Sequence, residues 1–541
     1  MVRIVSPSVA GRMLGIVLLS ANVTHGFIVA CNESQVYSQM ASCTSTSDPC
    51  VIDDQVICGA TCGDTCDYYF GETKHVRLSG SLGSFVNASF NPKNITVTTG
   101  SVTTTGENVV RFEAGGGNGT LNAHLEVTAN LGSVNLYPGQ IRNTGVAAGS
   151  VTYVRGATGV TLGKVDTRAT GSTEVGGTML LATPGDLYLK DTIDGSGPNG
   201  GAFMLLQGNR VFVQADVIAK ATATGTGGDI QVITVADLVP SQPSIEISAP
   251  IIASVTASTS SADGGSLFIG KTPGHTWEPT IVISDAVNAS ATLGDAGSIT
   301  IQGMWVNMNA TPSELNAFAS SNAGTHGGTI DVTTTSTTHS SYFRLLDVRG
   351  HHGGTVRMRV ANALTQFDKD IHADSNQSPD GVGGVISVRT AANNGVTNCW
   401  DCQEPGDACA CGVPPTCTQT IQINEDFIAN GNGSSAGDGG AIILEAPYVY
   451  MRATGATRRL IANATTGTES TSGDQPGRIR VRARDSQFRA RTNTGTEHKI
   501  RALPDRAGTN EICITQPFGG DYKPTSFATC GPSYAPQCSP G

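Results

Sequence analysis

The densest group of ionisable side chains in this sequence lies between positions 367 and 374. Asp368, Asp370, His372 and Asp374 alternate there with Lys369, Ile371 and Ala373. If the segment is one strand, its carboxylates and imidazole share a face, and such a row can hold a divalent cation or contact sugar hydroxyls. The alternative interpretation is a solvated face, because strands of a repeat alternate outward polar residues with inward apolar ones.

Arginine alternates in the same manner at three other places in the chain. The residues are Arg357 and Arg359, then Arg389, then Arg478, Arg480, Arg482 and Arg484. If successive strands stack in register, these side chains form a basic stripe suited to an anionic polysaccharide or a cell surface. Alternatively, the last arginines protect an open sheet end, because outward charges discourage edge-to-edge pairing.

Cysteine offers two further chemistries, disulfide formation and zinc binding. The fourteen cysteines fall in three clusters: Cys31, Cys43, Cys50, Cys58, Cys62 and Cys66; Cys399, Cys402, Cys409, Cys411 and Cys417; and Cys513, Cys530 and Cys538. The spacings Cys58-x3-Cys62-x3-Cys66 and Cys399-x2-Cys402 are close enough for zinc ligands. Regular zinc-binding motifs contain a second pair of ligands, however, and no pair at the regular spacing follows either of them. We therefore predict disulfides, formed in an oxidising compartment, and no metal.

The N-terminus supports export. Arg3 and Arg12 precede a short apolar run at 13–19, which is the layout of a secretory signal peptide and is too short for a transmembrane helix. We place the signal at 1–30. The sequence Ile28-Val29-Ala30-Cys31 also resembles the bacterial lipoprotein box, in which the cysteine is lipidated. An outer-membrane lipoprotein is thus the alternative to ordinary secretion, in which Cys31 joins the first disulfide cluster.

Composition limits the classes of protein that this chain can belong to. The 541 residues include 67 glycines, only 14% are charged, and the net charge is −11. An acidic balance disfavours nucleic acid, because phosphate binding needs clustered lysine and arginine. The low charge also argues against a disordered tail, whereas plentiful valine, isoleucine and threonine predict short strands with glycine turns.

The elements that position these residues belong to one repeat. A glycine leads into an alternating strand at eleven anchors, most of them about 30 residues apart: Gly149, Gly177, Gly201, Gly228, Gly265, Gly297, Gly328, Gly354, Gly384, Gly440 and Gly477. Self-similarity at this period indicates a solenoid. The interval after Gly384 is nearly twice as long and contains the middle cysteine cluster, so we interpret 398–419 as a loop inserted in one coil.

The repeat predicts an all-β fold, a parallel β-helix of roughly twelve coils with Cys-rich caps at its ends. Each coil supplies about three short strands, and stacking buries the apolar face that one coil cannot bury alone. We expect the glycines to mark corners with positive φ. The predicted divisions are a cap at 31–73, the β-helix at 74–484 with its inserted loop, and a Cys-containing cap or tail at 485–541.

A family resemblance follows from the consensus Gly-Gly-x-Ile-x-Leu-x-Ala, found at Gly439–Ala446 and, less completely, at Gly227–Thr234. It resembles the right-handed parallel β-helix repeats of filamentous-haemagglutinin-type adhesins and related exported proteins of Gram-negative bacteria, over roughly Val76 to Arg484. The resemblance implies a secreted or surface-displayed rod with an adhesive or structural role.

Parallel β-helices also include pectate lyases and polygalacturonases, so a carbohydrate-active enzyme is the alternative function. Gly350-His351-His352-Gly353 and Arg478-Ile479-Arg480 resemble two elements of the polygalacturonase pattern, but its carboxylate elements have no match upstream. Because glycosidic cleavage needs a pair of carboxyl groups, we assign no catalytic residue. A surface groove lined by two close carboxylates on neighbouring coils would favour the enzyme.

The expected partners follow from these interpretations. We expect a polysaccharide or protein at a cell surface, no nucleic acid, no transmembrane segment, and lateral or end-to-end self-association of rods. No cofactor is expected. A calcium site is conceivable only through isolated turns such as Gly437-Asp438-Gly439, since tandem calcium-binding nonapeptides are absent.

Overall fold

The protein is described from a computed structural model of the 541-residue chain. The residues described are 27–87, 93–106, 109–115, 123–144, 150–235, 244–256, 262–274, 278–320, 324–375, 381–390, 419–431, 438–446, 448–451, 458–464, 477–483, 499–502, 512–514 and 521–523. Side chains are described for these residues except 482, 483, 499, 512–514 and 521–523.

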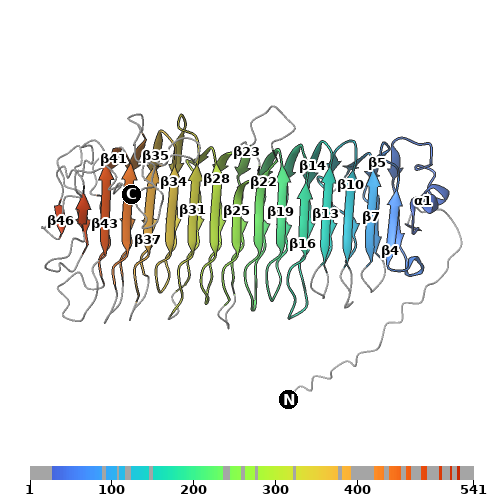
Figure 1. The fold of residues 1–541 in the computed structure, drawn as a ribbon. Coiled ribbons are helices and arrows are strands. Elements are labelled where there is room, and N and C mark those ends of the chain that lie inside the picture. Colours follow the sequence, from blue (N-terminus) through green and yellow to red (C-terminus); the bar gives the residue numbers. More distant parts are fainter. Residues whose placement is uncertain are drawn as a thin grey trace, which may run out of the picture.

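The chain forms a right-handed parallel β-helix, as the repeat predicted. Three parallel sheets, which we call A, B and C, run along the rod, and from β4 to β42 each coil contributes one strand to each sheet in the order B, C, A. The strands of sheet B form the front row of arrows in Figure 1, from β4 at one end to β43 near the other.

Sheet B has fifteen strands. They are β4 (Thr65–Tyr69), β7 (Asn94–Thr99), β10 (His124–Ala129), β13 (Val151–Gly156), β16 (Thr178–Ala182), β19 (Phe203–Gly208), β22 (Asp229–Thr234), β25 (Ser266–Lys271), β28 (Ser298–Gly303), β31 (Thr329–Thr334), β34 (Thr355–Val360), β37 (Val385–Thr390), β40 (Ala441–Ala446), β43 (Arg478–Ala483) and β45 (Ile512–Ile514).

Sheet C has fourteen strands. They are β2 (Cys50–Ile52), β5 (His75–Ser79), β8 (Ser101–Thr105), β11 (Val134–Asn135), β14 (Gly159–Leu162), β17 (Asp186–Leu189), β20 (Arg210–Val213), β23 (Ser244–Ile247), β26 (Thr280–Ile283), β29 (Trp305–Asn307), β32 (Ser340–Phe343), β35 (Leu364–Phe367), β38 (Thr420–Ile423) and β41 (Tyr448–Met451).

Sheet A has seventeen strands, most of them short. They are β1 (Phe27–Val29), β3 (Gln55–Cys58), β6 (Ser84–Asn87), β9 (Val110–Glu113), β12 (Gln140–Arg142), β15 (Lys164–Asp166), β18 (Ile193–Asp194), β21 (Val217–Ile218), β24 (Ile251–Ile252), β27 (Ala286–Asn288), β30 (Glu314–Asn316), β33 (Leu345–Asp347), β36 (Ile371–His372), β39 (Phe427–Ile428), β42 (Arg459–Ile461), β44 (Lys499–Arg501) and β46 (Asp521–Lys523).

The core is a set of stacked apolar columns. In sheet B, Ile299 pairs with Ile330, which pairs with Val356, and all three side chains are fully buried. Strands pair in register, so an apolar residue in one coil meets an apolar residue in the next, and each such burial contributes about 1.5–3 kcal/mol relative to an exposed side chain. The same register aligns the outward residues of successive coils, which is what positions the candidate sites.

The eleven glycine anchors all lead into strands of sheet B, from β13 to β43. The stack nevertheless extends beyond the predicted limits of 74–484. At the N-terminal end β2, β3 and β4 already pair with β5, β6 and β7, and at the other end β44, β45 and β46 continue sheets A and B. These outer coils lack a glycine anchor, so the repeat predicted roughly twelve coils where sheet B has fifteen strands.

The anchor glycines are required for a different reason than the sequence suggested. Positive φ occurs at turn glycines such as Gly63 and Gly80, and not at the ten anchors among the described residues, so the prediction of left-handed corners was wrong there. The anchors lie where neighbouring coils come into close contact. A Cβ atom added at Gly297 would lie 1.8 Å from the carbonyl oxygen of Gly265, and one at Gly354 would lie 2.1 Å from that of Gly328. Close backbone approach therefore fixes glycine at the anchors.

Three disulfides fasten the first coil, and they pair Cys31 with Cys62, Cys43 with Cys50, and Cys58 with Cys66. The short helix α1 (Glu33–Gln39) lies at this end of the rod, as Figure 1 shows, with Val36 fully buried, and a 3-10 turn, η1 (Ala60–Cys62), carries one of the bonded cysteines. The predicted disulfide cluster at the N-terminus is thus present, as part of the solenoid.

Two expectations about the N-terminus need correction. Residues Phe27–Val29 form β1, which pairs with β3, and Ala30 is fully buried, so the first coil already begins within the segment 1–30 that we assigned to the signal. A lipidated Cys31 is also incompatible with this structure, because its sulfur is bonded to Cys62 and lipidation would use the same sulfur.

The other predicted cysteines are described only in part. Cys399, Cys402, Cys409, Cys411, Cys417, Cys530 and Cys538 lie outside the described residues, and Cys513 is placed by its backbone in β45. The inserted loop at 398–419 likewise lies outside them except for Gln419. Its position in the topology is defined, since it connects β37 of sheet B to β38 of sheet C.

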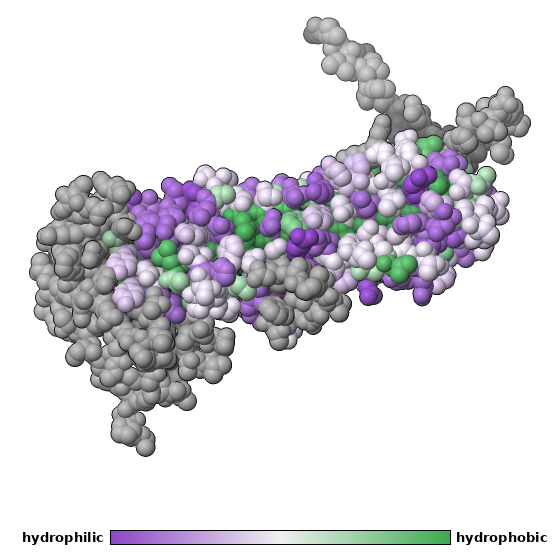
Figure 2. Space-filling view, turned by 90° about the horizontal axis from the view of Figure 1, so that it is seen from above, coloured by the Kyte–Doolittle hydropathy of each residue, from purple (hydrophilic) through white to green (hydrophobic). Residues whose placement is uncertain are grey.

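The surface of the rod is a mosaic. Figure 2 looks at it from above and shows hydrophilic residues over most of the described surface, with hydrophobic residues collected near the middle. Aromatic side chains also stack between coils: the rings of Tyr188 and Phe212, on neighbouring strands of sheet C, have centroids 4.5 Å apart. Arg210 lies over the Phe212 ring at 5.6 Å.

Candidate functional site

The predicted arginines come together on the outward face of sheet B. Arg357 and Arg359 lie on β34, and Arg359 is the register partner of Arg389 on β37. Two strands farther along, β43 carries Arg478, Arg480 and Arg482. Arg480 follows Ile443 in the row of Arg357, and Arg482 follows Glu445 in the row of Arg389.

Three of these arginines line a groove. The groove has a volume of about 480 Å³ and is lined by Thr355, Arg357, Met358, Arg359, Val385, Ser387, Arg389 and Ile443. Both Arg357 and Arg359 are exposed, whereas the side chain of Arg389 is only 21% exposed. The groove therefore concentrates positive charge on a chain whose net charge is −11, and a low-dielectric wall strengthens the field of such a group.

The three guanidinium groups differ in their acidic neighbours. Arg389 lies 3.5 Å from the fully buried carboxylate of Glu445, and Arg357 lies 3.9 Å from the partly exposed Asp331. Within the described residues Arg359 makes neither an ion pair nor a side-chain hydrogen bond. It is also directly opposite Arg389, and like charges in cross-strand register are unfavourable. An anion in the groove would relieve this repulsion.

The two interpretations of the arginines can now be separated. The edge-protection hypothesis places Arg478, Arg480 and Arg482 near the last coil, and β43 is indeed the last strand but one of sheet B. This strand nevertheless pairs with β40 on one side and with β45 on the other. These arginines do not form the free end of sheet B. The binding hypothesis is better supported by the groove around Arg357, Arg359 and Arg389.

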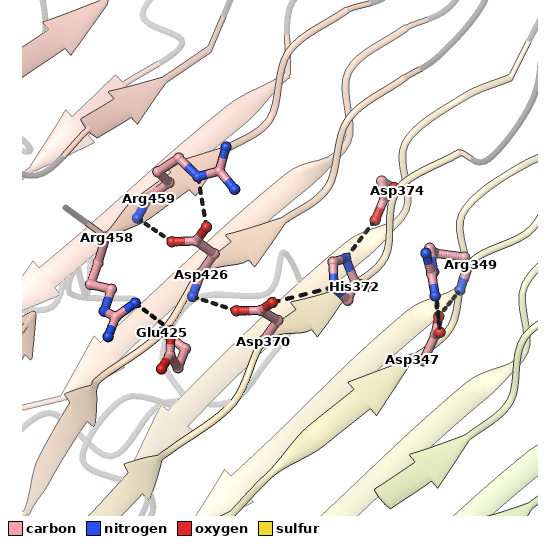
Figure 3. A network of polar contacts seen from close by, with 9 residues as sticks. All are labelled: Asp347, Arg349, Asp370, His372, Asp374, Glu425, Asp426, Arg458 and Arg459. Atoms are coloured by element: carbon pink, nitrogen blue, oxygen red, sulfur yellow. Dashed lines mark hydrogen bonds and ion pairs between the residues drawn. The ribbon is translucent and has the colours of Figure 1, made fainter. Parts of the chain in front are cut away.

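The predicted acidic row is brought together only in part. Asp370, His372 and Asp374 gather on the outward face of sheet A, where the ring of His372 lies 3.1 Å from Asp374 and 3.7 Å from Asp370 (Figure 3). Asp368 is not on this face. It follows β35 of sheet C and accepts hydrogen bonds from Gln366 and Asn424. The chain turns between β35 and β36, so the alternation across the four residues spans two sheets.

The two carboxylates keep His372 protonated. Burial by itself would lower the pKa of His372, but hydrogen bonds to Asp370 and Asp374 outweigh it and raise this pKa to about 9. The hydrogen bond to His372 in turn lowers the pKa of Asp370. At neutral pH the group is therefore an imidazolium between two carboxylates, which is a poor site for a cation.

The charges around this group are also paired. Figure 3 shows three further ion pairs, each between a carboxylate and an arginine: Asp347 with Arg349, Asp426 with Arg459, and Glu425 with Arg458. The backbone N–H of Asp426 donates to Asp370, which links the pairs of successive coils. The cluster has the properties of a structural charge ladder that holds coils together.

Metal ligands converge at only one place among the described residues. The sulfur atoms of Cys58, Cys62 and Cys66 lie within 4.8 Å of one another. All three are engaged in disulfides, however, with Cys66, Cys31 and Cys58 as their respective partners. Zinc binding by these thiolates would require both bonds to be reduced.

A second groove, which the sequence did not predict, lies where sheet A turns into sheet B. Its volume is about 550 Å³. Its lining includes seven glycines from four successive coils, which we call the glycine floor: the anchors Gly228, Gly265, Gly297 and Gly328, and the glycines Gly227, Gly264 and Gly327 that directly precede three of them. The lining also includes a row of residues that are register partners on successive strands: Asp229, Ser266, Ser298 and Thr329. Asp295 and His326 also line the groove, and the backbone N–H of His326 donates a hydrogen bond to the Asp295 carboxylate at 2.7 Å.

The two motifs that resemble polygalacturonase elements do not form one site. His351 and His352 immediately precede β34, whereas Arg478 and Arg480 lie on β43, and β37 and β40 separate the two strands. His351 is buried and its ring packs against that of His352 at 4.7 Å. The ring of His352 lies equally close to that of His326, so these imidazoles pack against one another at the corner of the solenoid.

Comparison with known proteins adds no functional information. No family model, curated protein or solved structure matches this chain. In the part of the chain that the structure describes, no helix has the length and apolar character needed to cross a bilayer.

Proposed function

We propose that the protein is an exported, non-catalytic rod of the adhesin type, which binds acidic polysaccharide at a cell surface or in the extracellular matrix. The observation that carries the proposal is the groove on sheet B in which Arg357, Arg359 and Arg389 lie on adjacent strands. Guanidinium groups recognise carboxylate and sulfate groups by paired hydrogen bonds, and Arg359 is available for such a contact.

Two further features support export and an adhesive role. Three disulfides occur between Cys31 and Cys66, and disulfides persist in oxidising compartments. The repeat resembles that of filamentous-haemagglutinin-type adhesins, and a long rod can hold a binding face away from the surface to which it is attached. Because Cys31 is disulfide-bonded, we propose ordinary secretion or surface display rather than lipid anchoring.

A carbohydrate-active enzyme is the second candidate, and one observation favours it. The lining of the glycine-floored groove includes two carboxylates, Asp229 and Asp295, although they lie two coils apart and not on neighbouring coils. Burial raises the pKa of Asp229, which is the property of a general acid. Its neighbours in the same row are the hydroxyl groups of Ser266, Ser298 and Thr329, which could contact a sugar chain.

One experiment separates the two candidates. The purified mature protein is applied to an array of neutral, carboxylated and sulfated glycans, and each bound glycan is then tested for the release of reducing ends. We expect binding to acidic glycans and no release. Release that disappears in both Asp229→Asn and Asp295→Asn would establish the enzyme instead, and an array without any bound acidic glycan would contradict the adhesin proposal.

A further inference from the structure

The two grooves follow one another along the rod. The glycine-floored groove extends from Asp229 to Thr329, and the arginine groove begins at Thr355. Thr329 and Thr355 are register partners on the adjacent strands β31 and β34, so no coil separates the grooves. Together they cover seven successive strands of sheet B, β22 to β40, and at the spacing of neighbouring strands this corresponds to about 30 Å.

The two sections differ in charge. The first section presents hydroxyl groups of serine and threonine together with the carboxylates of Asp229 and Asp295. The second section presents Arg357, Arg359 and Arg389. A ligand that lies along both sections therefore needs an anionic group over the second section and hydroxyl groups over the first.

We infer that the two grooves form one continuous track, which binds a single acidic polysaccharide chain laid along the rod. The chain passes from the first residues of the strands in the first section to the fifth residues, Arg359 and Arg389, in the second. This inference rests on the proposed adhesive function and adds to it the orientation, the extent and the charge pattern of the ligand. A carboxylate or sulfate of the chain lies over Arg359 and Arg389. Its neutral sugars lie on the glycine floor. There the serine and threonine hydroxyls donate or accept hydrogen bonds with the sugar hydroxyls, and the two carboxylates accept them.

The charge pattern selects a polysaccharide over other linear polyanions. A nucleic acid carries one phosphate per nucleotide, so it would place negative charge beside Asp229 and Asp295 in the first section. A polysaccharide in which an acidic sugar alternates with a neutral one carries fewer charges and many hydroxyl groups. The glycine-lined floor also suits a chain, because no side chain projects from these residues into its path.

A length series of hyaluronan oligosaccharides, in which a uronate alternates with a neutral sugar, tests the track. Binding to the purified protein is measured by calorimetry from the disaccharide to the dodecasaccharide. We expect the dodecasaccharide to bind at least about tenfold more tightly than the tetrasaccharide, because only the longer chain reaches both sections. Equal affinities for the two lengths would overturn the track and leave the arginine groove as an isolated site.

Two variants locate the sections. Ser266→Trp fills the first section three strands from Arg357, and it is expected to reduce the affinity for the dodecasaccharide to that for the tetrasaccharide while leaving the tetrasaccharide unaffected. Arg359→Ser is expected to weaken both. The matched control Thr178→Trp, at the first position of β16 and outside both grooves, should change neither affinity.

The outcomes distinguish the track from the proposed function on which it depends. If the wild-type protein binds none of the oligosaccharides and no acidic glycan, the adhesive function itself is wrong. If the tetrasaccharide binds but Ser266→Trp leaves the dodecasaccharide unaffected, the function stands and the track is wrong. Binding of a single-stranded oligodeoxynucleotide of equal length with equal affinity would also overturn the inference, because the charge pattern would then play no part.

Discussion

Sheets A and B of this rod present charges in two different ways. On sheet A, the residues around His372 are arranged so that every carboxylate in Figure 3 contacts a cation, and each cation contacts a carboxylate. On sheet B, Arg359 and Arg389 are placed directly opposite each other, and a groove lies over them. The sequence alternates polar residues in both regions, and only the register of the coils shows which charges are satisfied.

This difference separates structural charges from charges available to a ligand. A paired charge that is half buried stabilises the stack as long as its partner is present, and loss of the partner is costly. An unpaired, exposed charge contributes little to stability, but its field remains available to a partner. Substitutions in the two faces should therefore affect different measurements.

The largest effect is expected in the paired face. Asp426 accepts hydrogen bonds from the backbone N–H and the guanidinium of Arg459, and its side chain is 12% exposed. Asp426→Ala removes both bonds and leaves Arg459 without its counter-charge. We expect the free energy of unfolding to fall by about 2–3 kcal/mol, as measured by urea denaturation. Glu72→Ala, at an exposed position, is the control, and equal stability of the two variants would contradict the pairing.

The next effect concerns binding and not stability. The double substitution Arg357→Ser, Arg359→Ser removes two of the three cations of the groove. We expect the affinity for a sulfated or uronic polysaccharide to fall at least about tenfold, or about 1.4 kcal/mol, with an unchanged unfolding midpoint. Arg349→Ser on sheet A should give the opposite result, lower stability with unchanged binding. If both variants lose stability alike, the distinction between the two faces does not hold.

A smaller effect is expected from pH. The pKa of His372 is raised in the folded protein from 6.5 to about 9, so the imidazolium stabilises the fold fully below pH 6.5, and this stabilisation is lost as the pH rises through 9. Partial solvent exposure screens the group, so the loss is on the order of 1 kcal/mol. Thermal unfolding between pH 6 and 10 measures it. The same decline in His372→Gln would show that another group is responsible.

The smallest effect would make sheet B resemble sheet A. Thr333 is exposed and is the register partner of Arg359 on the preceding strand. Thr333→Glu places a carboxylate beside that guanidinium, and such a cross-strand pair contributes about 0.2–1 kcal/mol to stability. We expect a slightly higher unfolding midpoint together with weaker polyanion binding, whereas Thr333→Gln should change neither. Polyanion binding by Thr333→Glu as strong as that of the wild type would argue against a role for Arg359.

Much of the fold could be predicted from the sequence because the same pattern, a glycine followed by an alternating strand, occurs many times along the chain. Each anchor such as Gly297 precedes an alternating strand, so the coil and its period follow from local pattern alone. The first and last coils could not be counted, because β4 and β45 have no such glycine. The boundary of the N-terminal segment was also misplaced, since the strand pairing of Phe27–Val29 is not a local property.

The candidate sites depend on information that a single coil does not contain. The partners Arg359 and Arg389 are adjacent only because β34 and β37 pair in a particular register. The separation of Asp368 from Asp370 was missed because the chain turns between them. Polar residues continue to occupy every second position through this turn, so the sequence reads as one strand. The glycine-floored groove was missed for a related reason, since its lining comes from four successive coils that only the strand register brings together.

The direction of the hydrogen bonds has a mechanical consequence for the rod. Every strand bonds to its equivalent in the next coil, so the ladders run along the long axis, and tension along that axis opens them one coil at a time. The first coil behaves differently, because covalent bonds such as Cys31–Cys62 and Cys58–Cys66 close it on itself. Force applied to the N-terminal end therefore acts first on a coil that is closed by disulfide bonds, and these bonds must break before that coil can be extended fully.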